Sequence, residues 1–367
     1  MCKVCSAKAI ALLYRSDKQL SITSDLRLWK EGIEVFQCKA CGCVFKKPDK
    51  SQLKKIYQHY QLFEDSEEND QAIFISGKPQ PRTRIIVDSL SLARLPGSGK
   101  FLDIGCNKGF LLKQFSGSFP GWSVFGHELS RVYENYVKKI PHFGGFYSGE
   151  ISNIRSKFDL ISMIHTLEHI ENPQKFLKSI NKLLTPDGSL LIQVPNLLQN
   201  PFDILVFEHI SHFSPQTLEQ MLINAGFEVV LKSTQIVPKE LTFIAKPNRR
   251  YGGSLKFEHF LQMTANKNVE FLKKFEELVV SVAQRKPLVV FGTAEVGTWV
   301  AGLLDGEFDF FVDESPWRIG KKHLGKKIFH PGVLKGEENV ILAMAPILSK
   351  NIMQRWKDSN ARFLYPV

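Results

Sequence analysis

The sequence contains no run of about eighteen consecutive apolar residues, the minimum for a membrane-spanning helix. We therefore expect no transmembrane segment and no membrane partner. The first residues also lack the apolar stretch of a secretory signal peptide, which predicts a cytoplasmic protein. Cysteine is scarce, with 6 among 367 residues. In a cytoplasmic chain this argues against a framework of disulfides.

Acidic residues are the minority among the charges, with 37 Asp and Glu against 48 Lys and Arg, a formal net charge of +11. This excess fits a solvated surface, a phosphate-bearing substrate or RNA. RNA-binding surfaces interleave basic and exposed aromatic residues in one block. No such block is evident, so a nucleic-acid partner is not expected. The length exceeds one typical domain, and we predict three, over residues 1–60, 61–250 and 251–367.

Two C-x-x-C pairs stand in the N-terminal part of the chain: Cys2 with Cys5, and Cys38 with Cys41. Four thiolates at this spacing predict a tetrahedral, structural zinc site with no position left for water. Cys43 is an alternative ligand, although the spacing favours the two pairs. Segments 18–23 and 33–37 have strand character, so residues 1–60 are expected to form a zinc-ribbon module. Four unrelated cysteines are the other interpretation.

An apolar strand before Asp103 leads into a turn that contains Gly105, Asn107 and Gly109, and a helix follows from Phe110. In an open α/β sheet this pattern predicts a nucleotide-cofactor site, because the backbone of the turn comes close to the ligand. We expect the acid and the three turn residues to contact a cofactor. An ordinary tight turn is the alternative for the glycines.

Further cofactor contacts are expected at the ends of the next strands. A second strand ends in Glu128, placed to hydrogen-bond a ribose, and Leu129 follows it. A third strand ends at His165, which is expected to border the cofactor. Glu168 and His169, which follow in the L-E-H-I turn, are expected to be turn and helix-entry residues.

This series resembles the class I S-adenosylmethionine-dependent methyltransferases. The D-x-G-x-x-x-G turn, the F-D-L strand, the L-E-H-I turn and the P-D-G-x-L-L-I strand stand in that family's order. The resemblance implies a doubly wound α/β sheet that binds S-adenosylmethionine. The family usually carries glycine where Asn107 stands. Asparagine tolerates positive φ better than most residues, so the turn is expected to keep its form.

Segment 196–214 leaves the edge of the sheet where ligands bind in open α/β folds, and it carries Glu208, His209 and His212. A neighbouring carboxylate raises the basicity of a histidine and fixes its tautomer, as a general base requires. We therefore predict that His209 is the base and that Glu208 supports it. Closing the cofactor pocket is the alternative for His209, and a structural role before the next helix is the alternative for His212. Tyr60 is a further catalytic candidate, because a loop beside it could cover a substrate cleft.

The C-terminal third has a second strand–glycine turn–helix over residues 287–297 and a strand that ends at Asp313, which predicts a second, smaller α/β unit. With it, the whole chain resembles the three-domain C-methyltransferases of nucleotide-linked deoxysugars. These have an N-terminal zinc-binding domain and a C-terminal Rossmann-like domain. The E-H pair at Glu208, the Y-G-G-S-L-K segment from Tyr251 and the V-D-E-S-P segment from Val312 carry this resemblance.

The resemblance implies an activated sugar or another glycan precursor as substrate, with His209 removing a proton from a carbon beside a sugar carbonyl. Glu295 departs from the family, which has lysine in this phosphate-facing turn, and a carboxylate opposes a diphosphate. Three alternatives stay open. They are a sugar O-methyltransferase, a zinc-ribbon RNA methyltransferase favoured by the net charge, and a non-catalytic binding protein suggested by Asn107 and Glu295. The sequence does not indicate the oligomeric state.

Overall fold

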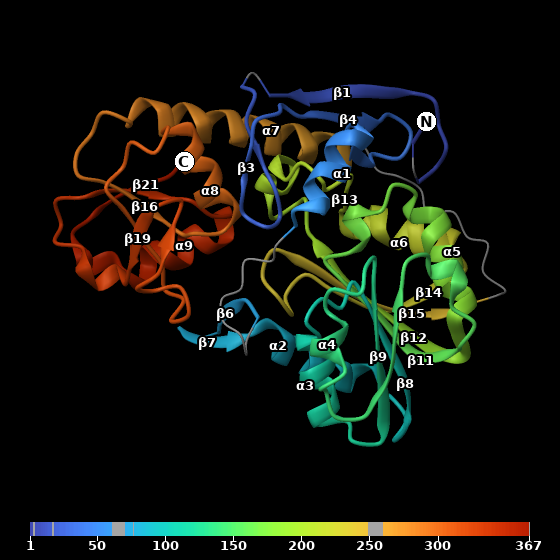
Figure 1. The fold of residues 1–367 in the computed structure, drawn as a ribbon. Helices are drawn as coiled ribbons and strands as arrows, with labels where there is room; N and C mark the ends of the chain where they lie inside the picture. Colours follow the sequence, from blue (N-terminus) through green and yellow to red (C-terminus); the bar gives the residue numbers. More distant parts are fainter. Residues whose placement is uncertain (3, 17, 61–69, 76, 249–259, 367) are drawn as a thin grey trace.

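The computed structural model describes residues 1–367 except 3, 17, 61–69, 76, 249–259 and 367, and it leaves out the side chains of 260–264. Its strands form a central seven-stranded sheet, an N-terminal sheet and a C-terminal sheet, with two separate hairpins. In Figure 1 the N-terminal sheet lies above the central sheet, and the C-terminal unit lies to one side of both.

The central sheet has the strand order β10-β9-β8-β11-β12-β15-β14. Its strands are β8 (Gly99–Ile104), β9 (Trp122–Glu128), β10 (Phe143–Ser148), β11 (Phe158–Ile164), β12 (Leu184–Pro195), β14 (Phe227–Ser233) and β15 (Glu240–Pro247). Strands β8 to β12 are parallel, and β15 is antiparallel to both of its neighbours. The chain adds β9 and β10 on one side of β8 and then crosses over to form β11 on the other side of β8. The carboxyl ends of β8 and β11 therefore flank the crevice where α/β sheets bind ligands.

Helices cover both faces of this sheet because its strands are apolar on both sides. Phe101 and Leu160 pack in the core beneath α3, whereas Leu102 and Ile161 pack beneath α5, as alternation along a strand requires. The elements around the sheet are α2 (Arg82–Ser89), η1 (Leu90–Ala93), α3 (Phe110–Ser118), α4 (Glu134–Val137), η2 (Ile151–Asn153), η3 (Leu167–His169), α5 (Pro173–Leu183), η4 (Pro201–Leu205) and α6 (Pro215–Asn224). The predicted methyltransferase-type sheet is thus confirmed.

The N-terminal sheet has the order β1-β4-β5-β13, and its last strand comes from the central part of the chain. Its elements are β1 (Ile10–Arg15), β4 (Glu34–Cys38), β5 (Val44–Lys46) and β13 (Ser211–His212), with the hairpin β2 (Ser21–Ile22) and β3 (Leu28–Trp29), and α1 (Lys50–Gln58). Asp49 caps α1 by accepting a hydrogen bond from the Ser51 N–H at 2.6 Å. The chain therefore ties the segment that carries His212 to the cysteine-bearing module.

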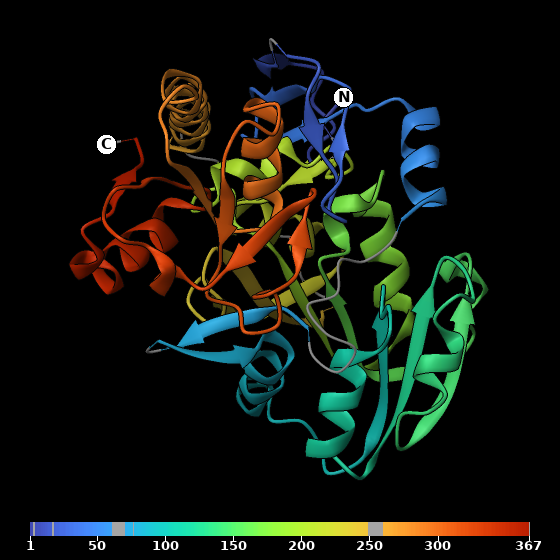
Figure 2. The same cartoon turned by 60° about the vertical axis from the view of Figure 1, so that its left-hand side comes forward.

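The segment between α1 and α2 contains a short hairpin. Beyond residues 61–69, which lie outside the description, it forms a hairpin of β6 (Ala72–Ile75) and β7 (Lys78–Pro81). Figure 2 shows this hairpin between α2 and the C-terminal unit. The guanidinium of Arg355 lies 5.8 Å from the ring centroid of Phe74, a contact that links the hairpin to that unit. These strands pair although the segment contains proline and glycine, because both strands are short and lie at an edge, where proline is tolerated.

The C-terminal sheet has the order β18-β19-β17-β16-β20-β21, with all pairs parallel except β18 with β19. Its elements are α7 (Phe260–Ser281), β16 (Leu288–Phe291), α8 (Glu295–Leu303), β17 (Phe310–Val312), β18 (Lys322–His323), β19 (Lys326–Phe329), η5 (Pro331–Val333), β20 (Asn339–Leu342), α9 (Pro346–Arg355), η6 (Lys357–Ser359) and β21 (Arg362–Leu364). One apolar cluster contains Val35 of the N-terminal sheet, Phe202 of η4 and Phe275 of α7. These parts therefore share a core.

Among the described residues, no helix is both long and apolar enough to cross a membrane. The predicted domain boundaries adjoin or lie within segments 61–69 and 249–259, which are outside the described residues. The segment from Tyr251 to Lys256 is outside them too. The division into three domains stays a prediction.

Candidate active site

A cavity of about 820 Å³ opens at the carboxyl edge of the central sheet. Residues from the central part, from the N-terminal module and from the C-terminal unit all line it. The predicted site residues on its wall are Tyr60, Asp103, Gly105, Asn107, Glu128, Leu129 and His165. Its size falls within the range of small-molecule sites in proteins.

Asp103, at the end of β8, is buried and accepts a hydrogen bond from the Ser162 hydroxyl at 2.5 Å. Burial raises the pKa of Asp103 to about 7, because the interior disfavours the charged form. The next turn brings backbone to the cavity. Gly105 has φ +74°, and an added Cβ would lie 2.5 Å from the Thr166 hydroxyl oxygen. Only glycine leaves the turn this close to neighbouring groups.

Asn107 adopts φ +53°, as its residue type allows, and its N–H donates to the Glu128 carboxylate at 2.9 Å. Glu128, at the end of β9, also accepts from the N–H of Leu129 at 3.2 Å. Burial raises the pKa of Glu128 above its usual value. The side chain of Leu129 is 72% exposed although the residue lines the cavity. Gly109, with φ +80°, precedes α3, so the predicted turn begins this helix as expected.

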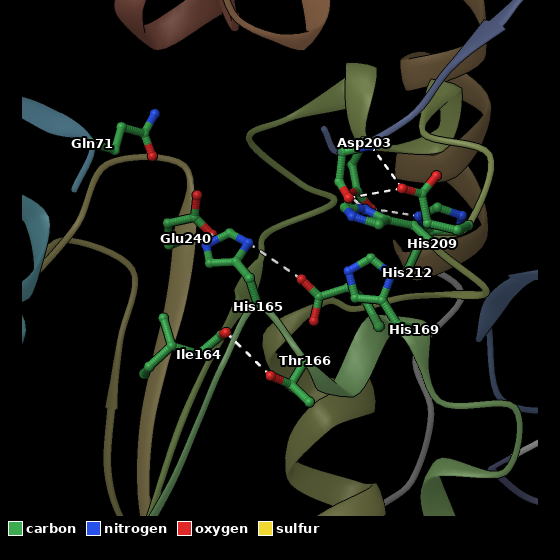
Figure 3. Close-up of polar contacts among 12 residues, drawn as sticks. Gln71, Ile164, His165, Thr166, His169, Asp203, His209, His212 and Glu240 are labelled. Atoms are coloured by element: carbon green, nitrogen blue, oxygen red, sulfur yellow. Dashed lines mark hydrogen bonds and ion pairs between the residues drawn. The ribbon is translucent and has the colours of Figure 1, made fainter. Parts of the chain in front are cut away.

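His165 lies between two carboxylates, as Figure 3 shows for Glu240. Its Nδ1 is 3.2 Å from Glu168, and its Nε2 is 3.2 Å from Glu240. Burial alone would lower the pKa of His165, but the negative charge of Glu240, together with Glu168, raises it to about 9. The imidazole is therefore cationic at neutral pH, beside the cofactor end of the cavity.

A single carboxylate, that of Asp203 in η4, holds both histidines of the following segment (Figure 3). One oxygen contacts Nδ1 of His209 at 2.6 Å, and the other contacts Nδ1 of His212. Burial opposes the charge on Asp203, but the two imidazoles outweigh it and hold the pKa of this carboxyl well below its usual range. Asp203 was not among the predicted residues.

The two histidines respond differently to this shared partner. Burial would lower the pKa of His209, but Asp203 outweighs it and raises the pKa above its usual value. In His212 burial prevails and lowers the pKa to about 4, although Asp203 opposes it. His209 is therefore the member of the pair that binds a proton more readily.

Glu208 favours the charged form of His209, as their adjacency suggests, but Asp203 has the larger effect and is the carboxylate bonded to the ring. The Glu208 carboxylate turns to the N-terminal module and accepts from the backbone N–H and the hydroxyl of Ser24, each at 2.7 Å. The Ser24 hydroxyl also lies 3.3 Å from the hydroxyl of Tyr60 on the cavity wall. Phe207 and Glu208 lie in a turn closed by the His209 N–H and the carbonyl of Val206 at 3.2 Å, and Glu208 and His209 contact different partners.

His169 lines the cavity, whereas His209 is 6% exposed and lies behind it. Their ring centroids are 4.7 Å apart at an interplanar angle of 88°. The Tyr57 hydroxyl lies 3.3 Å from Nδ1 of His169. Burial holds the pKa of His169 well below its usual value, so its ring is neutral. His169 lies in the turn that the sequence predicts, but it also joins the cavity to the His209–Asp203 pair.

Glu168, His169 and His209 offer one donor atom each within 4.8 Å of one another, a spacing that also suits metal ligands. His165 already faces Glu168, and Tyr57 faces His169. Two of these three side chains thus already have a polar neighbour on the cavity side.

The four cysteines of the two C-x-x-C pairs come together, with donor atoms within 4.8 Å of one another. The sulfurs of Cys2 and Cys41 are 3.4 Å apart, and those of Cys5 and Cys38 are 3.6 Å apart. Tetrahedral zinc with Zn–S bonds of about 2.3 Å needs sulfurs roughly 3.8 Å apart. The set can thus hold a metal ion with little adjustment. Cys43 is outside the set, and Cys106 is buried in the cofactor turn.

The C-terminal unit closes the cavity with Glu295 and Arg318. Glu295 begins α8, and burial would raise its pKa, but Lys239 and Arg318 lower it, so the carboxylate is charged. The Arg318 guanidinium donates to the Thr293 hydroxyl at 3.0 Å. Asp313 accepts from the Thr293 N–H at 3.1 Å, much as Glu128 accepts from Asn107. The unit therefore repeats the acid-to-turn contact of the central sheet.

Comparison with known proteins agrees with the fold. Residues 81–232 match the methyltransferase domain family. The chain is 28% identical over 127 residues to the mitochondrial ubiquinone biosynthesis O-methyltransferase of Schizosaccharomyces pombe, covering 32% of this chain and 46% of that protein. It is 28% identical over 141 residues to the C-methyltransferase NovU of Streptomyces niveus, covering 35% and 33%. The chain spans less than half the length of each of these curated relatives.

Solved structures with partial overlap include an S-adenosylmethionine-dependent methyltransferase from Clostridium acetobutylicum. It is 16% identical over 45% of this chain and 90% of that one, with a TM-score of 0.38. Human N-acetylserotonin methyltransferase, solved with S-adenosylmethionine, is 17% identical over 46% and 51%, with a TM-score of 0.38.

The family match, the relatives and the sheet order agree with a methyltransferase domain of the S-adenosylmethionine-dependent class in the central part of this chain. The predicted enzyme class agrees with these matches. The relatives include both C- and O-methyltransferases.

Proposed function

We propose that this protein is an S-adenosylmethionine-dependent methyltransferase that C-methylates a nucleotide-linked ketosugar or a similar glycan precursor, with His209 as the general base. The observation that carries the proposal is the shared cavity. One end is the glycine turn of the central sheet, and the middle is walled by His169 in front of the Asp203–His209 pair. The far end belongs to the C-terminal unit, which leaves room for an acceptor.

S-adenosylmethionine, when bound, supplies an electrophilic methyl group on a sulfonium. The residues that fit it are those of the turn. Glu128 would accept from ribose hydroxyls, and Asp103 would face the cationic methionine end. The backbone at Gly105 and Asn107 has the positive φ that such a close approach needs. Holding both reactants in one cavity accounts for a large part of the rate in a transfer of this kind.

The proposed base chemistry follows from the hydrogen bonds of His209. Asp203 accepts from Nδ1–H, so in the neutral ring Nε2 has the free lone pair and can take a proton from the acceptor. Asp203 then stabilises the imidazolium that results. The ring of His169 lies on the cavity side of His209. We therefore propose that the proton reaches His209 either through the His169 ring or by a route beside that ring.

The wall of the C-terminal unit supports a sugar ring at the far end of the cavity. The Glu295 carboxylate accepts hydrogen bonds from hydroxyls, and the Arg318 guanidinium donates to them. A diphosphate placed at the start of α8 would face the charge of Glu295. We propose that the phosphates of the substrate lie elsewhere and that its hydroxyls face this pair.

Zinc is part of the same proposal. The four clustered cysteines would hold it as a closed structural site, in the way that the three-domain C-methyltransferases imply for the N-terminal module. O-methylation of a sugar hydroxyl is the second candidate, and the likeness to the S. pombe O-methyltransferase favours it. The same base would serve that reaction.

Hydrogen exchange separates the two candidates. The protein is incubated with a nucleotide-linked ketosugar in D₂O without S-adenosylmethionine, and deuterium on the carbon beside the carbonyl is measured by mass spectrometry. C-methylation predicts exchange that His209→Ala slows by roughly 10²–10⁴-fold, whereas His212→Ala slows it much less. A methyl group found on oxygen after S-adenosylmethionine is added, with no exchange, would remove the C-methylation proposal. A loss in His169→Ala equal to that in His209→Ala would show that both rings carry the proton.

A further inference from the structure

A lysine of the N-terminal module lies buried beneath the segment that carries the proposed base. Lys46, the last residue of β5, is 2% exposed. Its ammonium donates to the carbonyl of Ile204 at 3.1 Å and also to the carbonyl of Val206. Charged side chains are rarely buried this fully unless something pairs with them. The two carbonyls flank the end of η4, the turn that begins two residues before Asp203.

The backbone around Lys46 fixes the same segment a second time. The Lys46 N–H donates to the carbonyl of Ile210 at 2.8 Å. Strand β13 pairs with β5 through Ser211 opposite Phe45 and His212 opposite Val44. The segment from η4 to β13 is thus bound to the module at both ends, and His209 lies between them.

The ammonium also shapes the electrostatics of the two histidines that share Asp203. The Lys46 charge disfavours a proton on His212, whereas Asp203 favours one on each ring. Burial lowers the pKa of Lys46 to about 7. The negative charges of Asp203 and Glu208 oppose this effect, because they favour the charged form of the lysine. The charged and titratable groups around this centre come from several elements: Lys46 from β5, Glu168 and His169 from η3, Asp203 from η4, Glu208 and His209 from the following segment, His212 from β13, and Glu295 from α8.

We propose that Lys46 is a positioning residue for the reaction: its ammonium holds the carbonyls beside η4 and so fixes the segment that bears Asp203. Its positive charge adds to the burial that disfavours a proton on His212, so a proton taken up by this pair goes to His209. The cysteine-bearing module then contributes to catalysis through a cation that touches no reactant. This inference rests on the proposed role of His209, but its test needs no acceptor.

The test is a histidine-ring NMR titration of the full chain, with His209 and His212 assigned by substitution. Lys46→Met removes the charge and the donor, whereas Lys46→Gln keeps an N–H donor without the charge. In both variants the pKa of His212 should rise by roughly one unit or more, since a cation close to it is gone. Lys47→Met is the matched control, because Lys47 is exposed at the next position, and both pKa values should stay unchanged.

Further measurements separate a local effect of Lys46 from a general loss of structure. Calorimetric affinity for S-adenosylmethionine should change less than about twofold in all three variants, because the cofactor turn is held by other contacts. If Lys46→Met does not fold, Lys46→Gln carries the test. A His212 pKa that is the same in folded Lys46→Gln and in the wild type would overturn the inference. In the wild type itself, His209 and His212 with equal pKa values would also overturn it. Failure of methyl transfer with an intact titration pattern would count against the proposed function only.

Discussion

The Glu208 carboxylate accepts two hydrogen bonds from Ser24, one from its backbone N–H and one from its hydroxyl, both at 2.7 Å. Both atoms meet the same oxygen, Oε1, and Glu208 is fully buried. The contact spans 184 residues of sequence. It fixes the loop between β2 and β3 against the segment that bears His209, and it places Ser24 beside Tyr60 on the cavity wall.

We therefore expect Ser24→Ala to weaken the link between the N-terminal module and this segment. The hydroxyl donates to a charged acceptor, so its loss should lower the free energy of unfolding by about 1.5–3 kcal/mol. Denaturant unfolding measures the change. Ser16→Ala, which removes a hydroxyl that donates to the Lys18 carbonyl in an exposed hydrogen bond, is the control and should be nearly neutral. Equal stability of the two variants would contradict the importance of this contact.

The sequence was sufficient to predict the cofactor turn, because that turn is local. Asn107 takes the positive φ that its residue type permits, and Glu128 reaches it from the next strand, as parallel strands that end at one edge allow. The N-cap of α6 at Ser214 follows the same logic: its hydroxyl accepts from the Thr217 N–H at 3.2 Å. Short-range rules decide all these positions.

The partners of the histidines could not be predicted in this way. Asp203 precedes His209 by six residues and His212 by nine, spacings that indicate no contact in a helix or a strand. Their meeting depends on the 3-10 turn η4. Lys46 lies about 160 residues before its two carbonyl acceptors, in another module. The adjacency of Glu208 and His209 indicated a pair, but the Glu208 carboxylate is bonded to Ser24 and the His209 ring is bonded to Asp203.

Glu128→Ala should weaken binding of S-adenosylmethionine at least tenfold. It removes a charge-assisted acceptor worth about 1.5–3 kcal/mol, and it also frees the N–H of Asn107, which would loosen the turn. Isothermal titration calorimetry measures the affinity. Glu128→Gln keeps an acceptor at the same place and should lose less. Unchanged affinity in Glu128→Ala would mean that the ribose is not bound here.

The cysteine cluster should bind about one zinc ion per chain, and Cys38→Ser should lose it. Structural zinc contributes directly to folding, so the N-terminal module should unfold at a lower temperature without the metal. Elemental analysis of protein purified without chelator, together with thermal unfolding, checks both points. Cys106→Ser is the matched control, because Cys106 is buried and lies outside the cluster. Zinc-free protein whose stability Cys38→Ser does not change would contradict the site.

Affinity for S-adenosylmethionine should increase between pH 6 and 7.5 because of Asp103. Burial raises the pKa of this carboxyl to about 7 in the unliganded protein, well above its usual value near 4. The sign follows from the raised value. Ionising the buried acid destabilises the unliganded fold as the pH rises from about 4 to 7, whereas a bound cation favours the ionised form. Binding of a cationic cofactor beside Asp103 therefore strengthens as the pH rises and levels off above 7.

The expected gain approaches tenfold per pH unit below the pKa and is smaller near it, so roughly three- to tenfold across this window. Calorimetric titrations at pH 6, 6.5, 7 and 7.5 measure it. Asp103→Asn has no charge to gain and should bind more weakly, with an affinity that no longer follows pH through this range. His165, whose raised pKa lies near 9, stays cationic throughout and does not add to the slope. If Asp103→Asn keeps the wild-type slope, another group titrates, and the cationic end of the cofactor does not lie beside this carboxylate.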